Sequence, residues 1–247
     1  MNATWNLWHG CKKYSEGCKY CYVYRGDTKY NRNSEDVKKT KNFALPLAKN
    51  RKGDFKYPPN TFFWLCFTSD FLLEEADCWR QEAWDIIRLR SDCHFLFITK
   101  RITRFMECIP SDWGDGWDNV TVVCTCENQK RADERLPVFL SLPIKHKCIT
   151  NEPLLEEIDL SQYLNEDIEQ VIVGGESGYY ARPCKYDWIT KIRQACIDKN
   201  VNFHFKQTGT HFVKDNKAYT IQRKLQHSQA RKANINYVIY NNKAYLK

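Results

Sequence analysis

The sequence predicts an α/β fold in which parallel strands alternate with helices. Short apolar runs rich in β-branched and aromatic residues recur along the chain, and their starts are separated by 32, 26, 26, 24 and 31 residues. Each interval has room for one strand, one helix and two loops. Strands that are apolar on both faces are typical of parallel sheets covered by helices. The six runs are Phe62–Thr68, His94–Thr99, Val120–Thr125, His146–Thr150, Gln170–Val173 and Val201–Phe205.

Helices are expected between these strands. The stretches Glu82–Arg90 and Tyr186–Lys199 carry apolar residues near helical spacing among charged ones. An earlier apolar run, Thr4–Trp8, is expected to supply the first strand. Residues 22–61 are polar and basic, which predicts a helix followed by a loop.

Composition excludes several classes of protein. The 247 residues are 43% hydrophobic and 28% charged, which is typical of a soluble globular chain. No uncharged apolar stretch reaches the ~18 residues of a membrane span, and the N-terminus has no basic start followed by an apolar run. We therefore expect a cytoplasmic protein with no membrane contact, whose twelve cysteines stay reduced.

Charge is distributed unevenly along the chain. Residues 11–56 carry 13 basic and 5 acidic side chains, residues 57–210 carry 17 and 24, and residues 211–247 carry 8 and 1. The basic tail also contains aromatic residues, a combination that suits phosphate contact and base stacking. A solvated β-rich appendage with edge-strand lysines is the alternative. The aromatic residues of the tail are Phe212, Tyr219, Tyr237, Tyr240 and Tyr245.

Polar or small residues follow each of the six predicted strands. Because parallel strands end at one edge of a sheet or one mouth of a barrel, these residues are expected to form a shared site. A buried ion pair or a helix cap is the alternative role for each of them. The residues are Ser69 and Asp70, Lys100 and Arg101, Glu127 and Asn128, Asn151 and Glu152, Gly174 to Ser177, and Lys206 and Gln207.

Three cysteines lie within eleven residues, at Cys11, Cys18 and Cys21, directly after the predicted first strand. Three thiolates can hold a [4Fe-4S] cluster and leave one iron open to a further ligand. A tetrahedral zinc site would need a fourth ligand, for which His9 and Cys184 are candidates. Unrelated thiols or a reactive pair are the third interpretation.

The role of Cys184 is left open by the sequence. Eight other cysteines are expected to be small buried apolar residues. They are Cys66, Cys78, Cys93, Cys108, Cys124, Cys126, Cys148 and Cys196.

An ordered series of motifs resembles the phage-type radical-SAM-like proteins, a family of unassigned function found in phages and prophages. The series covers about residues 3–210, and the cysteine segment departs from common radical SAM spacing by having six rather than three residues between its first two cysteines. The two-residue gap before Cys21 is kept. The motifs include Trp5-Asn6, Trp8 to Cys11, Gly17-Cys18, Cys21-Tyr22, Thr68 to Phe71, Glu74 to Asp77, Leu96 to Arg101, Asp112 to Trp117, Glu127 to Arg135, Glu152 to Leu155, Val173 to Gly178, Ala181 to Pro183 and Phe205 to Gln207.

The resemblance implies a partial (β/α)6 barrel of the radical SAM type over residues 1–210, with a small basic and possibly β-rich extension over residues 211–247. It also implies a [4Fe-4S] cluster on Cys11, Cys18 and Cys21, together with S-adenosyl-L-methionine. A reduced cluster of this kind cleaves the cofactor to a 5′-deoxyadenosyl radical, while the protein supplies orientation and exclusion of water.

Roles for the strand-end residues follow as expectations. Contacts to the methionine and adenosine parts of the cofactor are expected from Ser69, Asp70, Glu127, Asn128, Gly174, Gly175 and Glu176. A catalytic or substrate-facing role is expected for Thr99, Lys100, Arg101, Glu152 and Lys206. Lys206 is alternatively a structural partner of Glu152 or Glu176.

The expected substrate is a nucleic-acid base or nucleotide, modified, isomerised or repaired in phage DNA or RNA within a bacterial host. An external electron donor of the flavodoxin or ferredoxin type would reduce the cluster. Two alternatives stay open. One is the same chemistry on a peptide or small metabolite, and the other is a non-catalytic zinc or iron–sulfur module that binds nucleic acid.

Overall fold

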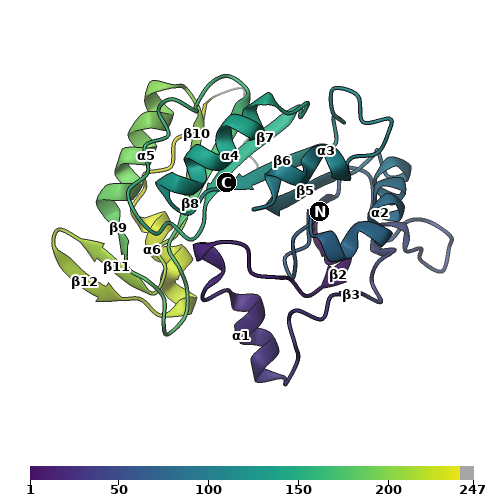
Figure 1. Ribbon diagram of the computed structural model, residues 1–247, viewed down its shortest axis with the longest axis horizontal. Coiled ribbons are helices and arrows are strands. Elements are labelled where there is room, and N and C mark those ends of the chain that lie inside the picture. The colour runs from purple at the N-terminus through teal and green to yellow at the C-terminus, as the bar shows by residue number, and fades with distance from the viewer. Residues whose placement is uncertain (240–247) are drawn as a thin grey trace. The chain divides into compact units, whose positions relative to one another are not determined.

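The computed structural model describes residues 1–239 and has a mixed α/β fold built on a seven-stranded sheet (Figure 1). The strand order is β1-β4-β5-β6-β7-β8-β10. This confirms the predicted α/β class with a parallel sheet, which is compatible with a partial barrel. Tyr240 and Tyr245, two of the predicted tail aromatics, lie outside the described residues. The strands are β1 Asn2–Trp5, β4 Phe62–Leu65, β5 His94–Thr99, β6 Val120–Thr125, β7 His146–Asn151, β8 Ile168–Gly174 and β10 Asn202–Gln207.

The chain divides into two compact units, and strand β6 runs from the first into the second. The second unit contains residues 211–239 together with the strands that precede them. Unit 1 comprises Met1–Tyr14, Val23–Val123 and Leu142–His146, and unit 2 comprises Ser15–Tyr22, Cys124–Ser141 and Lys147–Lys247.

Unit 1 is built around aromatic side chains on its parallel strands. β1 pairs with β4, and β4 pairs with β5, both in parallel register. Phe63 and Phe95, which are register partners, stack with ring centroids 5.2 Å apart, and Trp5 meets Phe95 edge-on at 5.8 Å. All three side chains are fully buried. Helix α2 (Asp77–Leu89) adds Trp84 to this core, where its ring lies 5.0 Å from that of Phe71.

Shorter elements complete unit 1. They are β2 Trp8–His9, β3 Lys38–Lys39, α1 Tyr22–Lys29 and α3 Phe105–Cys108. Residues 22–61 thus contain the predicted helix followed by a long connection. The connection is tied down by Arg90, a fully buried side chain whose guanidinium donates to the carbonyl oxygens of Pro46 and Tyr57.

Unit 2 pairs β7 with β8 and β8 with β10, again in parallel. Nearly all β8 residues are buried, as expected for a central strand covered on both faces. Helices α4 (Gln129–Ser141) and α5 (Tyr186–Asp198) turn their apolar stripes inward, with Leu136 and Ile192 both fully buried.

The C-terminal segment forms a hairpin and a helix. Strands β11 (His211–Lys214) and β12 (Lys217–Thr220) are antiparallel, and β11 also pairs in parallel with β9 (Cys184–Lys185). Helix α6 (Gln226–Lys232) follows and packs on β10. The β-rich expectation for this segment therefore holds for the hairpin but missed the helix.

Several predicted boundaries shift for local reasons. Strand β4 ends at Leu65 instead of Thr68, because Cys66 adopts a left-handed conformation with φ 55°. The predicted first strand, Thr4–Trp8, divides into β1 and β2. Cys78 is exposed, against expectation, whereas the other seven cysteines expected in the core are buried.

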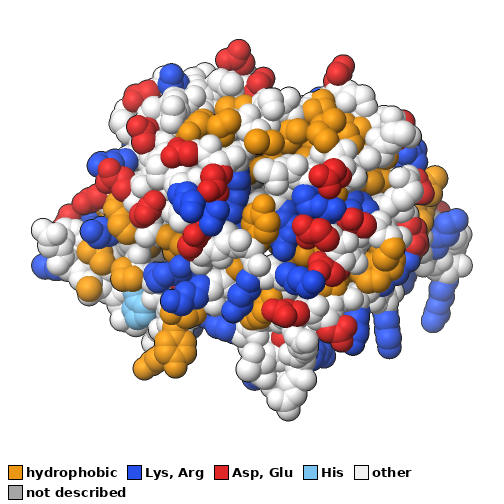
Figure 2. All heavy atoms as spheres, in the orientation of Figure 1, with side chains coloured by type: hydrophobic (Ala, Val, Ile, Leu, Met, Phe, Trp, Pro, Cys, Tyr) orange, Lys and Arg blue, Asp and Glu red, His pale blue; other side chains and the backbone are white. Residues whose placement is uncertain are grey.

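None of the helices in residues 1–239 has the length and apolarity needed to cross a bilayer. The face of the molecule in Figure 2 carries Lys and Arg side chains mixed with Asp and Glu rather than a single-signed field.

Candidate functional site

Cys11 follows β2 at a sharp turn made by Gly10. The φ of Gly10 is +102°, and a side chain there would place a Cβ only 2.8 Å from the carbonyl oxygen of Ser34. The Gly10 N–H donates to Thr68 O at 3.1 Å, and the Cys11 N–H donates to Ser34 O at 2.7 Å. Glycine is therefore required where the chain turns toward the first cysteine.

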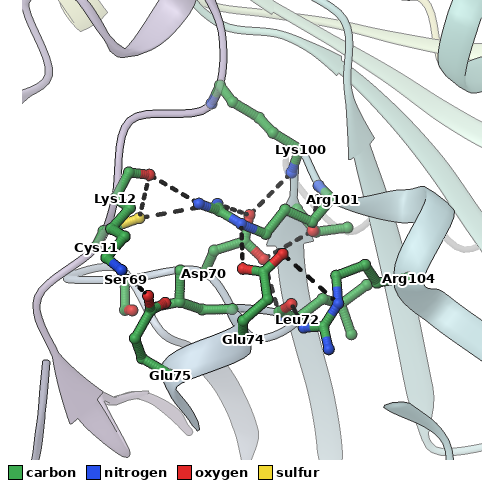
Figure 3. A network of polar contacts seen from close by, with 12 residues as sticks. Cys11, Lys12, Ser69, Asp70, Leu72, Glu74, Glu75, Lys100, Arg101 and Arg104 are labelled. Atoms are coloured by element: carbon green, nitrogen blue, oxygen red, sulfur yellow. Dashed lines mark hydrogen bonds and ion pairs between the residues drawn. The ribbon is translucent and has the colours of Figure 1, made fainter. Parts of the chain in front are cut away.

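Arg101, immediately beyond β5, holds the Cys11 segment of unit 1 (Figure 3). Its side chain is 4% exposed. One guanidinium nitrogen donates to Lys12 O at 2.8 Å, another lies 4.0 Å from the Cys11 sulfur, and the group sits 4.8 Å from the Tyr14 ring centroid. A cation beside a thiol favours the thiolate form that metals bind.

Asp70, beyond β4, binds the protein's own chain. Its carboxylate accepts hydrogen bonds from Thr99 Oγ1 at 2.7 Å, from the Lys100 N–H at 3.0 Å and from the Leu72 N–H at 3.0 Å. Arg101 approaches the same carboxylate at 3.5 Å. The structure thus brings these predicted strand-end residues together around Asp70.

Ser69 contributes by donating from its hydroxyl to Gly10 O, which links the end of β4 to the turn before Cys11. An ion pair lies next to this network in unit 1. Lys12 pairs with Glu75, and the hydrogen bond and charge of Glu75 raise the pKa of Lys12. Partial burial raises the pKa of Glu75, but the contact with Lys12 outweighs it and the net pKa is lowered.

In unit 2 the Cys18 segment is held by Glu127, beyond β6. Glu127 is fully buried, and its Oε2 accepts a hydrogen bond from Arg135 Nη1 at 2.8 Å. Its Oε1 accepts from the Ser15 hydroxyl and from the Gly17 N–H, the latter at 3.2 Å. The carboxylate therefore ties the turn Glu16–Cys18 to the end of a buried strand and to helix α4.

Two further arginines form hydrogen bonds with the same turn. Arg131 of α4 makes a bidentate contact with the Glu16 carboxylate, both distances being 2.9 Å. This contact lowers the pKa of Glu16 to about 2. Arg182 donates to Glu16 O at 3.0 Å and pairs with Glu176 through two nitrogens at 2.8 and 2.6 Å. Bidentate pairs of this kind fix orientation as well as contribute energy.

Tyr20, which lies between Cys18 and Cys21, is also held in unit 2. The Arg182 guanidinium lies 5.4 Å from the centroid of the Tyr20 ring, a distance that allows a cation–π contact. Tyr180 stacks on the same ring at 6.2 Å. Both neighbours restrict the chain between the last two cysteines.

Other predicted site residues of unit 2 have local partners. The Asn128 side chain accepts from the Arg131 N–H at 2.9 Å and so caps α4. A Cβ at Gly175 would lie 2.2 Å from Thr208 O, and one at Gly174 would lie 2.5 Å from Glu152 Oε1. Gly175 is therefore required by the approach of backbone atoms, whereas Gly174 lies against the movable end of a side chain.

Glu152 and Lys206 form an ion pair of 2.8 Å between the ends of β7 and β10. This is the structural pairing that the sequence left open for Lys206. His204 on β10 is largely buried, which lowers its pKa. Two buried side-chain oxygens at the ends of β6 and β7, Thr125 Oγ1 and Asn151 Oδ1, accept no hydrogen bond from the part of the chain that the structure describes.

The cysteine segment offers the right donor chemistry for an iron–sulfur cluster. Cys11, Cys18 and Cys21 are all partly exposed, and no disulfide forms among the cysteines of residues 1–239. Cys11 belongs to unit 1, whereas Cys18 and Cys21 belong to unit 2. Within these 239 residues no group of three or more His, Cys, Asp or Glu side chains is assembled to hold a metal ion.

Neither candidate for a fourth zinc ligand is poised for metal. His9 Nε2 contacts the buried Asp27 carboxylate at 2.8 Å, in a pair that joins β2 to α1. Cys184 is fully buried on β9, and burial raises its pKa to about 12. Cys184 thus behaves as a small apolar residue.

Three arginines that hold the site lie within the motifs of the sequence, but sequence reasoning gave them no role. They are Arg131, Arg135 and Arg182, all of which contact acidic residues at or near the cysteine segment. Arg131 and Arg135 are four residues apart and so share one face of α4. That spacing was the available signal, but it does not reveal which carboxylates the face would meet.

Comparison with known proteins gives one match. Residues 1–237 match a family described as "Protein of unknown function (DUF5131)". No curated protein and no solved structure gives a significant match. Since the match spans nearly the whole chain, this protein belongs to the DUF5131 family.

Proposed function

We propose that this protein is a radical S-adenosylmethionine enzyme that holds a [4Fe-4S] cluster through Cys11, Cys18 and Cys21. The observation that carries the proposal is that strand-end side chains hold the cysteine segment on both sides. Arg101 binds the segment at Cys11 and Lys12, and buried Glu127 binds it at Ser15 and Gly17. Loops positioned by a rigid scaffold are where binding and catalytic residues concentrate.

The roles of individual residues follow from these contacts. Arg101 holds the segment by its hydrogen bond to Lys12 O and by its contact with the Cys11 sulfur. Glu127, Arg131 and Arg182 orient the turn that presents Cys18. When bound, the cluster and S-adenosylmethionine would supply a carbon radical that abstracts hydrogen from a substrate.

A polar molecule at the strand ends is favoured by two buried oxygens. Thr125 Oγ1 and Asn151 Oδ1 accept no hydrogen bond from residues 1–239. Buried polar atoms of this kind normally have partners, and a donor supplied by a ligand or water would satisfy them. These oxygens are therefore candidates for contacts with the amino or hydroxyl groups of a bound nucleoside.

The substrate is proposed to be a nucleic-acid base or nucleotide, because the chain carries a net charge of +8 that is concentrated in its N-terminal and C-terminal parts. Basic surfaces attract polyanions and accelerate their association. A peptide or small-metabolite substrate would not require this charge.

Metal analysis under anaerobic conditions tests the cluster. After reconstitution with iron and sulfide, we expect about four iron and four sulfide per chain. Cys11→Ala, Cys18→Ala and Cys21→Ala should each lose most of this content. Cys78→Ala is the matched control, since Cys78 is an exposed cysteine outside the segment. Stoichiometric zinc without iron, or iron retained in all three variants, would overturn the assignment.

Cofactor cleavage tests the enzyme. The reconstituted protein, reduced and mixed with S-adenosylmethionine, should form 5′-deoxyadenosine, and the three cysteine variants should not. A cluster that forms without any cleavage would instead favour a nucleic-acid-binding iron–sulfur module.

A further inference from the structure

A cavity of about 270 Å³ lies in unit 2, where the C-terminal hairpin meets α5, β10 and α6. None of the described residues that line it is Asp or Glu. Its lining is dominated by four aromatic rings and two lysines, which are Tyr186, Phe205, Phe212, Tyr219, Lys214 and Lys232.

The hairpin register explains why these side chains meet. Phe212 on β11 is paired directly with Tyr219 on β12. Cross-strand partners lie on the same face of a sheet, as do residues two apart on one strand. Lys214 therefore shares the face of Phe212 and Tyr219, and this face turns toward the cavity.

Three of the four rings pack against one another, and the fourth, Tyr219, is partly exposed. Phe205 and Phe212 stack with centroids 6.2 Å apart, and Tyr186 meets Phe212 edge-on at 6.1 Å. Both phenylalanines are buried, whereas Tyr219 is 47% exposed. The Lys214 ammonium lies 4.7 Å from the centroid of the Tyr186 ring, so a positive charge stands beside the aromatic wall.

The surrounding segment carries charge without internal compensation. Residues 211–239 contain six Lys or Arg and one Asp. Within the described chain, none of these six forms an ion pair with an acidic side chain. A cavity lined by aromatic rings and by lysines without acidic partners is complementary to a flat ring that carries an anionic group.

We propose that this cavity binds the base of one nucleotide unit, with its phosphate beside Lys214 and Lys232. The volume is slightly below the ~300–1,000 Å³ of pockets for drug-sized ligands, which suits a single ring system. The inference deepens the nucleotide part of the proposed function and requires neither iron nor S-adenosylmethionine. The unit can come from a single strand of nucleic acid or from a mononucleotide.

Binding is measured on the full chain purified without cluster reconstitution. One arm titrates fluorescein-labelled 12-nucleotide dT and rU strands by anisotropy, and the other titrates AMP and CMP by calorimetry, both at low salt. If the strands bind more tightly than AMP and CMP, the bound nucleotide unit belongs to a nucleic acid. If AMP or CMP binds as tightly as the strands or more tightly, the ligand is a free nucleotide. Either outcome supports the proposal.

Matched variants locate the site. Tyr219→Ala should weaken binding about tenfold, because stacking on one aromatic ring contributes that much per base. Lys214→Glu should weaken binding more than Lys224→Glu, which changes the charge equally at a position outside the cavity. Tyr30→Ala, a loss of an exposed aromatic elsewhere, should leave binding unchanged.

Two results would overturn the proposal. One is the absence of binding to all four probes. The other is that the cavity variants Tyr219→Ala and Lys214→Glu bind the probes with the same affinity as the control variants Lys224→Glu and Tyr30→Ala. Circular dichroism verifies folding, and Lys232→Ala, a truncation of an exposed side chain, gives a second test if Tyr219→Ala fails to fold. If the protein binds no nucleotide but takes up iron normally, this inference is wrong and the cluster assignment stands. If it binds nucleotide but takes up no iron, the cluster assignment is wrong and this inference stands.

Discussion

Glu127 and Arg135 form an ion pair of 2.8 Å in which the side chains are 0% and 3% exposed. The pair does more than satisfy two buried charges, because the second oxygen of Glu127 accepts from Ser15 and Gly17. One carboxylate thus couples the core of unit 2 to the segment that carries Cys18.

Removing the Glu127 carboxylate should lower the stability of the protein. Glu127→Ala leaves the Arg135 charge buried without its partner, and we expect the free energy of unfolding to fall by about 3–5 kcal/mol. Glu134→Ala is the control, because Glu134 pairs with Arg131 at the surface and its loss should cost about 1 kcal/mol or less. Urea unfolding measures both, and similar losses in the two variants would show that burial of the pair does not matter.

The contact of Arg101 with Lys12 O predicts a local change in dynamics. Arg101→Gln removes a charged donor, so amide hydrogen exchange of residues 10–14 should accelerate about tenfold or more. Arg104→Gln is the control, because Arg104 contacts Leu72, Glu74 and Asp77 and not the cysteine segment. Unchanged exchange in Arg101→Gln would mean that other contacts hold the segment.

The two glycines Gly175 and Gly26 should respond to alanine in opposite directions. Gly175→Ala forces a methyl group to within 2.2 Å of Thr208 O, which should destabilise the protein by about 1–3 kcal/mol or more. Gly26 lies in α1 with no atom near its virtual Cβ, so Gly26→Ala should stabilise by about 0.5–1 kcal/mol. Thermal unfolding distinguishes them, and a tolerated Gly175→Ala would contradict the close approach.

The stability that Asp92 contributes to unit 1 should depend on pH. Its hydrogen bonds with buried Arg90, at 2.8 and 3.0 Å, lower its pKa below the ordinary 3.8. A lowered folded pKa means that the stabilisation is complete above the unfolded value and is lost as pH falls through the folded one. The stability difference between wild type and Asp92→Asn should therefore be constant above about pH 5 and shrink below about pH 3.8. A difference that is undiminished at pH 2.5 in urea unfolding would contradict this assignment.

Strand positions could be predicted well because they depend on local composition. The predicted ranges for β5 and β6 match the structure to the residue, since each largely apolar run has charged residues within two positions of both ends. Cys66 shows the limit, because its left-handed backbone ends β4 early and follows from contacts that are distant in sequence. Helix α2 begins at Asp77 rather than Glu82, so its first five residues were not predicted.

The sequence predicted which acidic residues lie at the strand ends of the candidate site, but it did not predict their ion-pair partners. Asp70 and Glu127 were expected at strand ends, and both lie there. Their partners could not be predicted, because Arg135 and Arg101 reach them through the packing of separate elements. Pairing of buried charges depends on tertiary geometry that residue spacing does not encode.

The pairing of β11 with β9 has a practical consequence for anyone shortening this chain. Strand β9 carries the buried Cys184 opposite Phe212, and the Phe203 N–H donates to Tyr237 O at 2.8 Å. A protein truncated at residue 210 would expose an unpaired strand edge and apolar side chains, which favours aggregation. Crystallisation trials should therefore retain everything up to residue 239.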